Sequence, residues 1–176
     1  MRLYKDIFTE KDVFTDAFKI ELVDDLVYVV TGKLIECSTE IDESAIGGNK
    51  SAEDTAEDVK SDAILIGNII DGANLQEIPS IASKSDFKAA VKKYADKLVK
   101  KVSETDAERG NFLKTNMSKA IAPILKDFKN LQFFATDGDE LDLDGMIIVY
   151  EQLGEYKVGT EVKITVFKDG LYDEKC

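Results

Sequence analysis

Apolar residues recur at helical spacing in two successive runs between positions 84 and 130. The first run places an apolar side chain at every third or fourth position, which lines one face of a helix: Phe87, Val91, Tyr94, Leu98 and Val102. The second run has the same spacing and comprises Leu113, Met117, Ala120 or Ile121, Ile124 and Phe128. Together they predict a helical hairpin over residues 84–130.

The ends of these helices carry sequence signals of their own. Ser83 or Ser85 is suited to cap the first helix, because a serine hydroxyl accepts a hydrogen bond from the unpaired amides of a first turn. Thr105 and Glu108 have the spacing of a capping box and predict the start of the second helix. Pro123 falls inside the second run, where it removes one amide donor and crowds the preceding turn. We therefore expect a bend at Pro123 and not the end of the helix.

Outside the hairpin the patterns are typical of strands. Polar and apolar residues alternate over 162–167, and the other short runs are rich in β-branched and aromatic residues: 26–30, 63–70, 131–135 and 146–150. Asp24-Asp25 and residues 156–159 are suited to tight turns between strands. The expected fold class is α+β, a mainly antiparallel sheet into which the helical hairpin is inserted.

Length and charge place these elements in one acidic domain. The chain has 176 residues, 44% hydrophobic and 33% charged, which fits a single globular domain over residues 1–176. Residues 36–62 contain nine acidic side chains and two lysines in a stretch rich in small polar residues, which predicts a mobile acidic loop. Residues 84–130 hold twelve basic and six acidic side chains. The helical hairpin is therefore the basic part of an acidic chain.

Composition also excludes several functions. Histidine is absent, which excludes catalysis and zinc binding that depend on imidazole. The formal net charge of −12 disfavours binding to nucleic acids. No apolar run approaches the roughly 20 residues of a membrane-spanning helix, and the first eight residues are too charged for a signal peptide. We expect a cytosolic protein that binds neither nucleic acid nor membranes.

Several motifs resemble the translationally controlled tumour protein family, in the same order along essentially the whole chain. The most specific is residues 46–54, Ile-Gly-Gly-Asn-Lys-Ser-Ala-Glu-Asp, followed by three further matches: residues 130–134, 144–146 and the C-terminal 167–176, which ends in Cys176. The resemblance implies a tent-like β-sheet domain with a protruding helical hairpin, similar to small chaperones of Rab GTPases. It also implies a cytoplasmic protein without enzymatic activity, which in some members also occurs outside cells.

The resemblance further implies binding partners. Members of the family are described as binding calcium and microtubules, and are linked to Rheb-type small GTPases, to a translation elongation factor and to anti-apoptotic Bcl-family proteins. We expect a regulatory binding protein that associates with tubulin. The alternative is a regulator of a Rheb- or Rab-type GTPase, acting as an exchange factor or chaperone.

One acidic cluster has the spacing of a calcium-binding loop. Glu140, Asp142 and Asp144 occupy its first, third and fifth positions, Gly145 the sixth and Glu151 the twelfth. Glu140 stands where such loops usually have Asp, and both flanks have the pattern of strands and not of helices. Three interpretations remain open: an acidic turn without a site, weak calcium binding and a high-affinity EF-hand. We expect weak binding of Ca²⁺, to which the 36–62 loop can add a loose attraction.

Other residues are candidates for contacts with partners. Four lysines on the first helix would complement an acidic surface such as the tubulin tails, and the alternative is an ordinary solvated helix face: Lys93, Lys97, Lys100 and Lys101. Asp12 lies where the resembling family has an acidic residue that contacts a GTPase, although its own sequence context indicates only a turn.

Two more positions are candidates for covalent modification. Ser44 has an acidic environment suited to phosphorylation by acidophilic kinases. Cys37 and Cys176 do not form a disulfide framework, and we expect both to be free thiols in a monomer. Under oxidising conditions, the accessible Cys176 is expected to link two chains in a disulfide dimer.

Overall fold

The computed structural model describes residues 1–37, 64–136 and 145–175. Their strands are β1 (Arg2–Asp6), β2 (Asp12–Thr15), β3 (Lys19–Val23), β4 (Val27–Cys37), β5 (Ile64–Gly67), β6 (Gln76–Glu77), β7 (Leu131–Ala135), β8 (Ile148–Gln152), β9 (Glu161–Phe167) and β10 (Leu171–Lys175). Their helices are α3 (Asn68–Ala73), α4 (Lys84–Ser103) and α5 (Ala107–Lys126), with two short 3-10 turns, η1 (Phe128–Asn130) and η2 (Lys168–Gly170). The predicted α+β class is confirmed.

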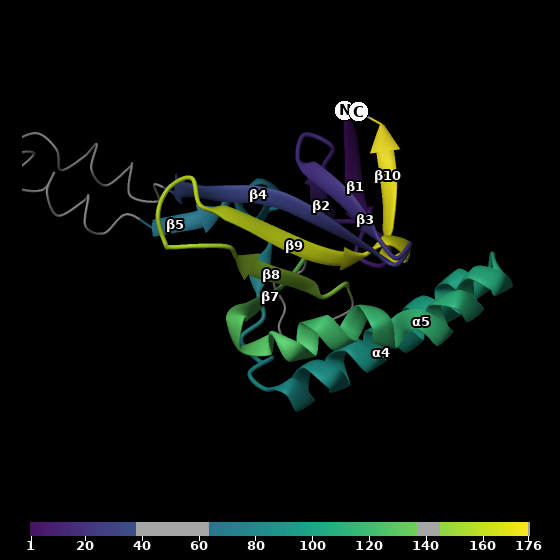
Figure 1. Cartoon of the computed structure of the whole chain (residues 1–176). Helices are drawn as coiled ribbons and strands as arrows, with labels where there is room; N and C mark the ends of the chain where they lie inside the picture. Colours follow the sequence, from purple (N-terminus) through teal and green to yellow (C-terminus); the bar gives the residue numbers. More distant parts are fainter. Residues whose placement is uncertain (38–63, 137–144, 176) are drawn as a thin grey trace, which may run out of the picture.

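The strands form two sheets in which every pairing is antiparallel (Figure 1). The larger sheet has the order β3-β4-β9-β8-β7-β6, and β5 pairs with the distal half of β4. The smaller sheet has the order β10-β1-β2, so the two ends of the chain are neighbours. Arg2 of β1 lies opposite Lys175 of β10.

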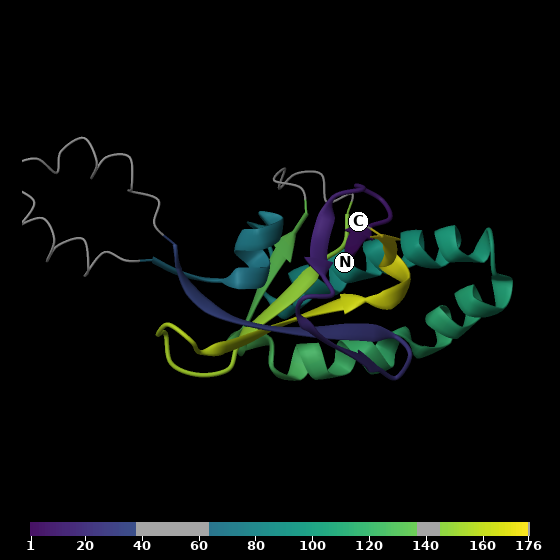
Figure 2. The same ribbon diagram turned by 90° about the horizontal axis from the view of Figure 1, so that it is seen from above.

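The larger sheet is the middle of three layers, as Figures 1 and 2 show. Successive residues of β7 point to its two faces. Phe133 packs on Phe87 of α4, with ring centroids 5.0 Å apart, whereas Phe134 contacts Tyr150 on the other face. That second face also carries Tyr28, which contacts Tyr4 of the smaller sheet. The helical hairpin thus covers one face, and the smaller sheet with α3 covers the other.

The predicted hairpin is confirmed, with one correction at a helix start. Ser83 caps α4: its hydroxyl accepts a hydrogen bond from the amide of Asp86, and the Asp86 carboxylate accepts one from the amide of Ser83. The expected capping box with Thr105 is wrong, because Asp106 occupies the cap position and accepts from the amide of Arg109 at 3.0 Å. Helix α5 continues past Pro123 to Lys126, as expected.

The strand predictions are mostly confirmed as well. Asp24 and Asp25 form the β3–β4 turn, both with positive φ (54° and 57°), a conformation that short aspartate side chains tolerate. The run 63–70 is only partly a strand, since β5 ends at Gly67 and the chain then turns into α3. The acidic loop expected over 36–62 begins later, because β4 continues to Cys37, and the rest of that loop lies outside the described residues.

No helix in the described part of the chain is long and apolar enough to span a membrane.

Candidate functional site

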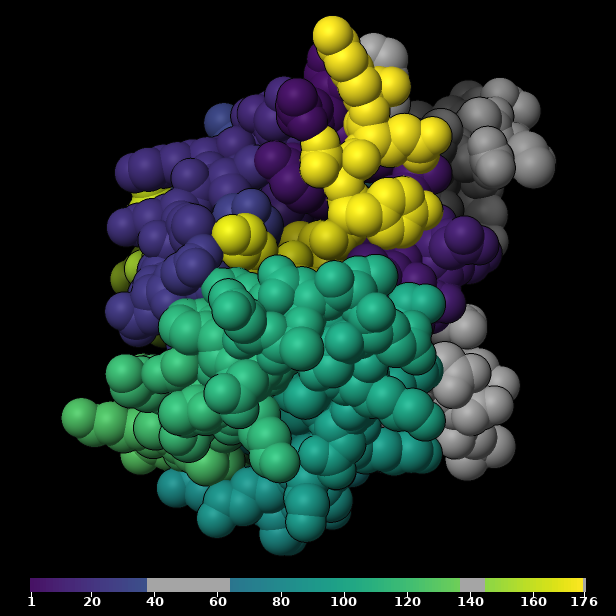
Figure 3. Space-filling view, turned by 90° about the vertical axis from the view of Figure 1, so that its right-hand side faces the viewer, coloured from purple at the N-terminus to yellow at the C-terminus, as the bar shows by residue number. Residues whose placement is uncertain are grey.

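The lysines of α4 give one helix a high density of positive charge. This helix contains seven lysines and two aspartates, while its apolar residues Phe87, Val91, Tyr94 and Leu98 are buried against the sheet. The lysines of α4 are exposed, and Figure 3 shows α4 and α5 together forming a broad continuous face. We call the four exposed lysines named above, Lys93, Lys97, Lys100 and Lys101, the lysine face.

The members of the lysine face differ in their surroundings. The ammonium group of Lys97 lies 4.2 Å from the centroid of the Phe8 ring, a cation–π distance. Lys93, Lys100 and Lys101 form no ion pair with any described residue. Lys100 and Lys101 lie in the last turn of α4, where the helix dipole favours cations. These three charges are therefore available to an external anion.

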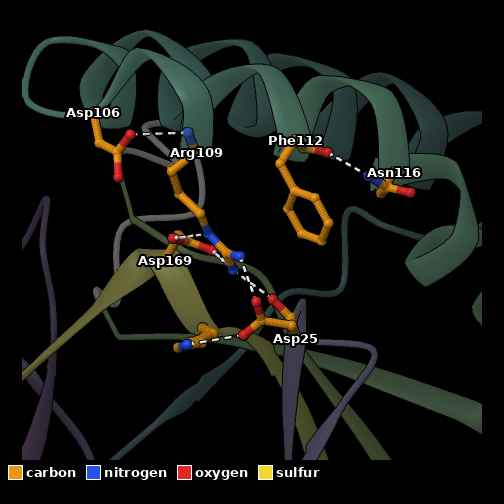
Figure 4. A network of polar contacts seen from close by, with 7 residues as sticks. Asp25, Asp106, Arg109, Phe112, Asn116 and Asp169 are labelled. Atoms are coloured by element: carbon orange, nitrogen blue, oxygen red, sulfur yellow. Dashed lines mark hydrogen bonds and ion pairs between the residues drawn. The ribbon is translucent and has the colours of Figure 1, made fainter.

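A polar network fixes the hairpin onto the sheets (Figure 4). The guanidinium of Arg109 donates two hydrogen bonds to Asp169 of η2, at 2.9 and 2.7 Å. It donates two more to Asp25 of the β3–β4 turn, one to the carboxylate at 2.8 Å and one to the backbone carbonyl. Asp25 also accepts from Lys168 at 2.9 Å. The hydrogen bonds from Lys168 and Arg109 lower the pKa of Asp25, and the bond to Asp169 raises the pKa of Arg109. The start of α5 is thereby held to two turns at once.

A second network surrounds the buried carboxylate of Asp6. It accepts hydrogen bonds from the amide of Phe8 at 2.9 Å, the amide of Met146 at 2.8 Å and the hydroxyl of Thr136 at 3.1 Å. Thr136 and Met146 flank residues 137–144 on either side. Asp6 therefore anchors both ends of the segment that contains three of the candidate calcium ligands.

The four candidate calcium ligands do not come together in the part of the chain that is described. Glu140, Asp142 and Asp144 lie outside it. Glu151 lies on β8 opposite Leu131, at the far end of the β7–β8 ladder from residues 137–144, and its carboxylate is 3.5 Å from the ammonium of Lys163. Among the described residues, no group of three or more acidic or thiol side chains is placed to hold a metal ion.

The remaining candidates are dispersed. Asp12 is the exposed first residue of β2, not a turn residue, and lies 3.9 Å from the ammonium of Lys5. It borders an open hollow together with Lys11, Asn74 and Gln76. Cys37 is a free thiol at the end of β4. Ser44 and Cys176 lie outside the described residues.

Two key residues, Arg109 and Asp6, were not singled out from the sequence, although Arg109 carries a signal. It is one of only two arginines in a chain with twenty-one lysines. An arginine in such a lysine-rich composition indicates a position that uses the planar, bidentate guanidinium, which lysine cannot replace. Asp6 has no comparable signal, because its partners are 130 and 140 residues away.

Comparison with known proteins identifies the family. The family model for the translationally controlled tumour protein matches residues 1–172. The chain belongs to this family. A homologue of the translationally controlled tumour protein from Lonomia obliqua is 38% identical over 178 residues and 99% of each chain, and one from Drosophila melanogaster is 36% identical over the full length of both.

Solved structures of translationally controlled tumour proteins share the fold. The Schizosaccharomyces pombe protein superposes with a TM-score of 0.73 at 27% identity, and the Caenorhabditis elegans protein with a TM-score of 0.70 at 29% identity. The matches cover all of this chain and at least 99% of each of those chains. The similarity suggested by residues 46–54 and the C-terminal motifs is thus confirmed at the level of family and fold.

Proposed function

We propose that this member of the translationally controlled tumour protein family is a non-enzymatic, cytosolic regulatory protein. In this proposal its lysine face binds acidic protein surfaces, in particular the acidic tails of tubulin on microtubules. The observation that supports the proposal is the charge of α4. Seven lysines and two aspartates share one helix, and Lys93, Lys100 and Lys101 form no ion pair with the described residues.

The distribution of charge, not its total, supports an acidic partner. The chain as a whole carries −12, so at long range it is repelled by an anionic polymer. At physiological ionic strength, however, exposed charges are screened over about 8 Å. A flexible acidic tail that reaches α4 therefore experiences mainly the local lysines. Such binding is weak, rapid and sensitive to salt.

Microtubule co-sedimentation tests this proposal. A variant in which Lys93, Lys97, Lys100 and Lys101 are changed to Gln should lose most of its binding at low salt. The matched control changes four exposed lysines elsewhere to Gln, namely Lys11, Lys33, Lys157 and Lys175, which alters the net charge equally. A triple variant that retains Lys97 keeps the contact with Phe8 and separates charge loss from a structural effect. Equal binding of the quadruple variant and its control would contradict the proposal.

Weak calcium binding is the second part of the proposal. Carboxylates are dense in residues 36–62 and 137–144, and Asp6 anchors the ends of the latter segment. Without a fixed cage of six to eight oxygens, the expected dissociation constant is on the order of 0.1 to 1 mM. Calorimetry tests this value: micromolar affinity, or no heat at several millimolar calcium, would exclude it.

The alternative function is regulation of a Rheb- or Rab-type GTPase through Asp12, with a translation elongation factor as a further candidate partner. It is supported by the exposure of Asp12 at the edge of the hollow bordered by Lys11, Asn74 and Gln76. A nucleotide-release assay distinguishes the two functions. Accelerated release that is lost in Asp12→Asn and retained in the lysine-face variant would favour the GTPase role, and no acceleration would exclude it.

A further inference from the structure

A second cavity lies on the face of the larger sheet opposite the lysine face. It has a volume of about 320 Å³ and lies between β5 and α3 on one side and β7 and β8 on the other. Gln132, Phe134, Tyr150 and Gln152 line it from the sheet, and Ile66 and Ile70 line it from β5 and α3. Among the residues that the structure describes, no charged side chain lines this cavity, although one third of the chain's residues are charged.

The polar groups in the cavity are neutral and incompletely paired. The Tyr150 hydroxyl and the Gln132 amide form no hydrogen bond with any described residue. The amide nitrogen of Gln152 donates to the Gly154 carbonyl at 2.7 Å, which leaves its oxygen free to accept. Burial raises the pKa of Tyr150, so its hydroxyl stays protonated and remains a donor at neutral pH. The cavity thus offers hydrogen-bond donors and acceptors that match a peptide group.

Gly67 keeps this cavity open. A Cβ at this position would lie 3.0 Å from the Tyr150 ring and 3.2 Å from its hydroxyl oxygen. Any larger residue would therefore press on Tyr150 and fill the space beside it.

Exposed apolar side chains are concentrated in β5 and in the β8–β9 loop, whose Tyr156 lines the cavity. Seven large hydrophobic residues are exposed in the described part of the chain, and four of them belong to β5 or to the β8–β9 loop: Ile64, Leu153, Tyr156 and Val158. The hydroxyl of Tyr156 accepts from the Leu65 amide at 2.8 Å and donates to the Leu65 carbonyl at 3.0 Å. This pair of bonds fastens the loop to β5, and both Tyr156 and Leu65 line the cavity.

We propose that this corner is a docking site for an extended peptide segment of a partner protein with an uncharged aromatic or aliphatic anchor residue. The anchor occupies the cavity, whose volume is at the lower limit for a ligand pocket and suits one side chain. The peptide groups beside the anchor hydrogen-bond to Gln132, Gln152 and Tyr150. The rest of the segment packs on Leu153, Tyr156 and Val158, an apolar area that extends beyond what a small molecule in the cavity would cover.

The uncharged lining that the described residues form disfavours a charged anchor, because burying an unpaired charge without a counter-ion is costly. The two proposed sites should also differ in their salt dependence. Binding at the cavity should be nearly independent of salt concentration, whereas binding to the lysine face should weaken as salt is added. Since the two sites lie on opposite faces of the larger sheet, a peptide and an acidic surface can be bound at the same time.

NMR titration of the full chain tests the docking site, with N-acetyl-tryptophanamide and N-acetyl-leucinamide as probes for an anchor flanked by peptide groups. We expect saturable shifts confined to the amides around Leu65, Gln132, Gln152 and Tyr156, at low and high salt alike. N-acetyl-lysinamide should leave them unchanged. Tyr150→Phe, which removes only the hydroxyl, should weaken binding about fivefold, the equivalent of one hydrogen bond.

Leu153→Ala and Leu22→Ala form a matched pair, because these leucines are 44% and 45% exposed and lie in different parts of the fold. The first should weaken binding several-fold and the second should not. The proposal is overturned if neither amide probe shifts these resonances, if both leucine variants behave alike, or if N-acetyl-lysinamide binds equally well. Equal affinity for 3-methylindole, which has no amide group, would assign the cavity to small aromatic molecules and would also overturn it.

Discussion

Arg109 and Asp169 lie 60 residues apart in the chain and meet through two hydrogen bonds, in which Nε and Nη2 of the guanidinium each donate to one oxygen of the carboxylate. Both side chains are largely buried, with 18% and 13% of their surface exposed. This pair fixes the first turn of α5 to η2, and the further bond to Asp25 ties it to the β3–β4 turn. The position of the helical hairpin over the sheet therefore depends on one arginine.

We expect Arg109→Ala to lower the free energy of unfolding by about 3 kcal/mol, because it leaves the buried Asp169 carboxylate without its counter-ion. The control is Arg2→Ala, which breaks an exposed pair with Asp173 whose side chains are 56% and 43% exposed. Its cost should stay below about 1 kcal/mol. Urea unfolding of the three proteins gives both values, and a similar cost for the two variants would show that Arg109 is not the anchor.

Asp25→Asn should destabilise the protein at neutral pH but not in acid. The pKa of Asp25 is lowered in the folded state by Lys168 and Arg109, so its ionised form stabilises the fold above the ordinary aspartate pKa of about 4. That contribution is lost as the pH falls through the folded-state pKa. The melting temperatures of wild type and variant should therefore converge at low pH. A difference that is constant from neutral to acidic pH would contradict this assignment.

Tyr94→Phe should stabilise the protein by about 1 kcal/mol, since the hydroxyl of Tyr94 is buried and has no hydrogen-bond partner among the described residues. Burial, followed by the charges of Asp6 and Asp169, raises the pKa of Tyr94 well above its ordinary value. The unfolded chain therefore loses this proton first, and wild-type stability should fall as the pH rises above about 10. The difference in stability between Tyr94→Phe and the wild type should therefore increase as the pH rises above about 10. Thermal melts would measure both effects, with Tyr172→Phe at an exposed site as the control.

Two glycines in neighbouring elements should respond in opposite directions to alanine. A Cβ on Gly32 of β4 would lie 2.8 Å from the Ile69 side chain and would also collide with the Asn68 side chain that accepts a bond from the Lys33 amide. We expect Gly32→Ala to cost about 1 to 3 kcal/mol. Gly72→Ala meets nothing within 4 Å and should stabilise α3 by about 0.5 to 1 kcal/mol. Chemical unfolding of both variants checks the two signs.

The parts of the fold that were predictable from sequence are those whose pattern is local. Phe87, Val91, Tyr94 and Leu98 repeat at helical spacing because one face of α4 is buried along its length. Helix α3 was missed because its buried residues, Ile69 and Ile70, continue the apolar run of β5 without a change of period. The α5 cap was misassigned by one residue, since Thr105 and Asp106 are both suited to the position.

Features that depend on distant residues could not be read from the chain. The strands β1, β2 and β10 form a small sheet in which many side chains are only partly buried, so they show no clear alternation. The lysine face was predictable, because its charge lies within one helix. The neutral cavity was not, since Gly67, Gln132 and Tyr150 meet only after β5 and β7 have been placed on the sheet.

The pairing of Arg2 with Lys175 sets the order in which the protein can be completed. A ribosome synthesises β1 first and β10 last, so β1 waits for its outer neighbour until almost all of the 176 residues have been made. Helices α4 and α5, whose mutual contacts are local in sequence, can associate while the chain is still growing. The smaller sheet cannot close until β10 has been synthesised. Closure of the smaller sheet is therefore a late, non-local step in the folding of this chain.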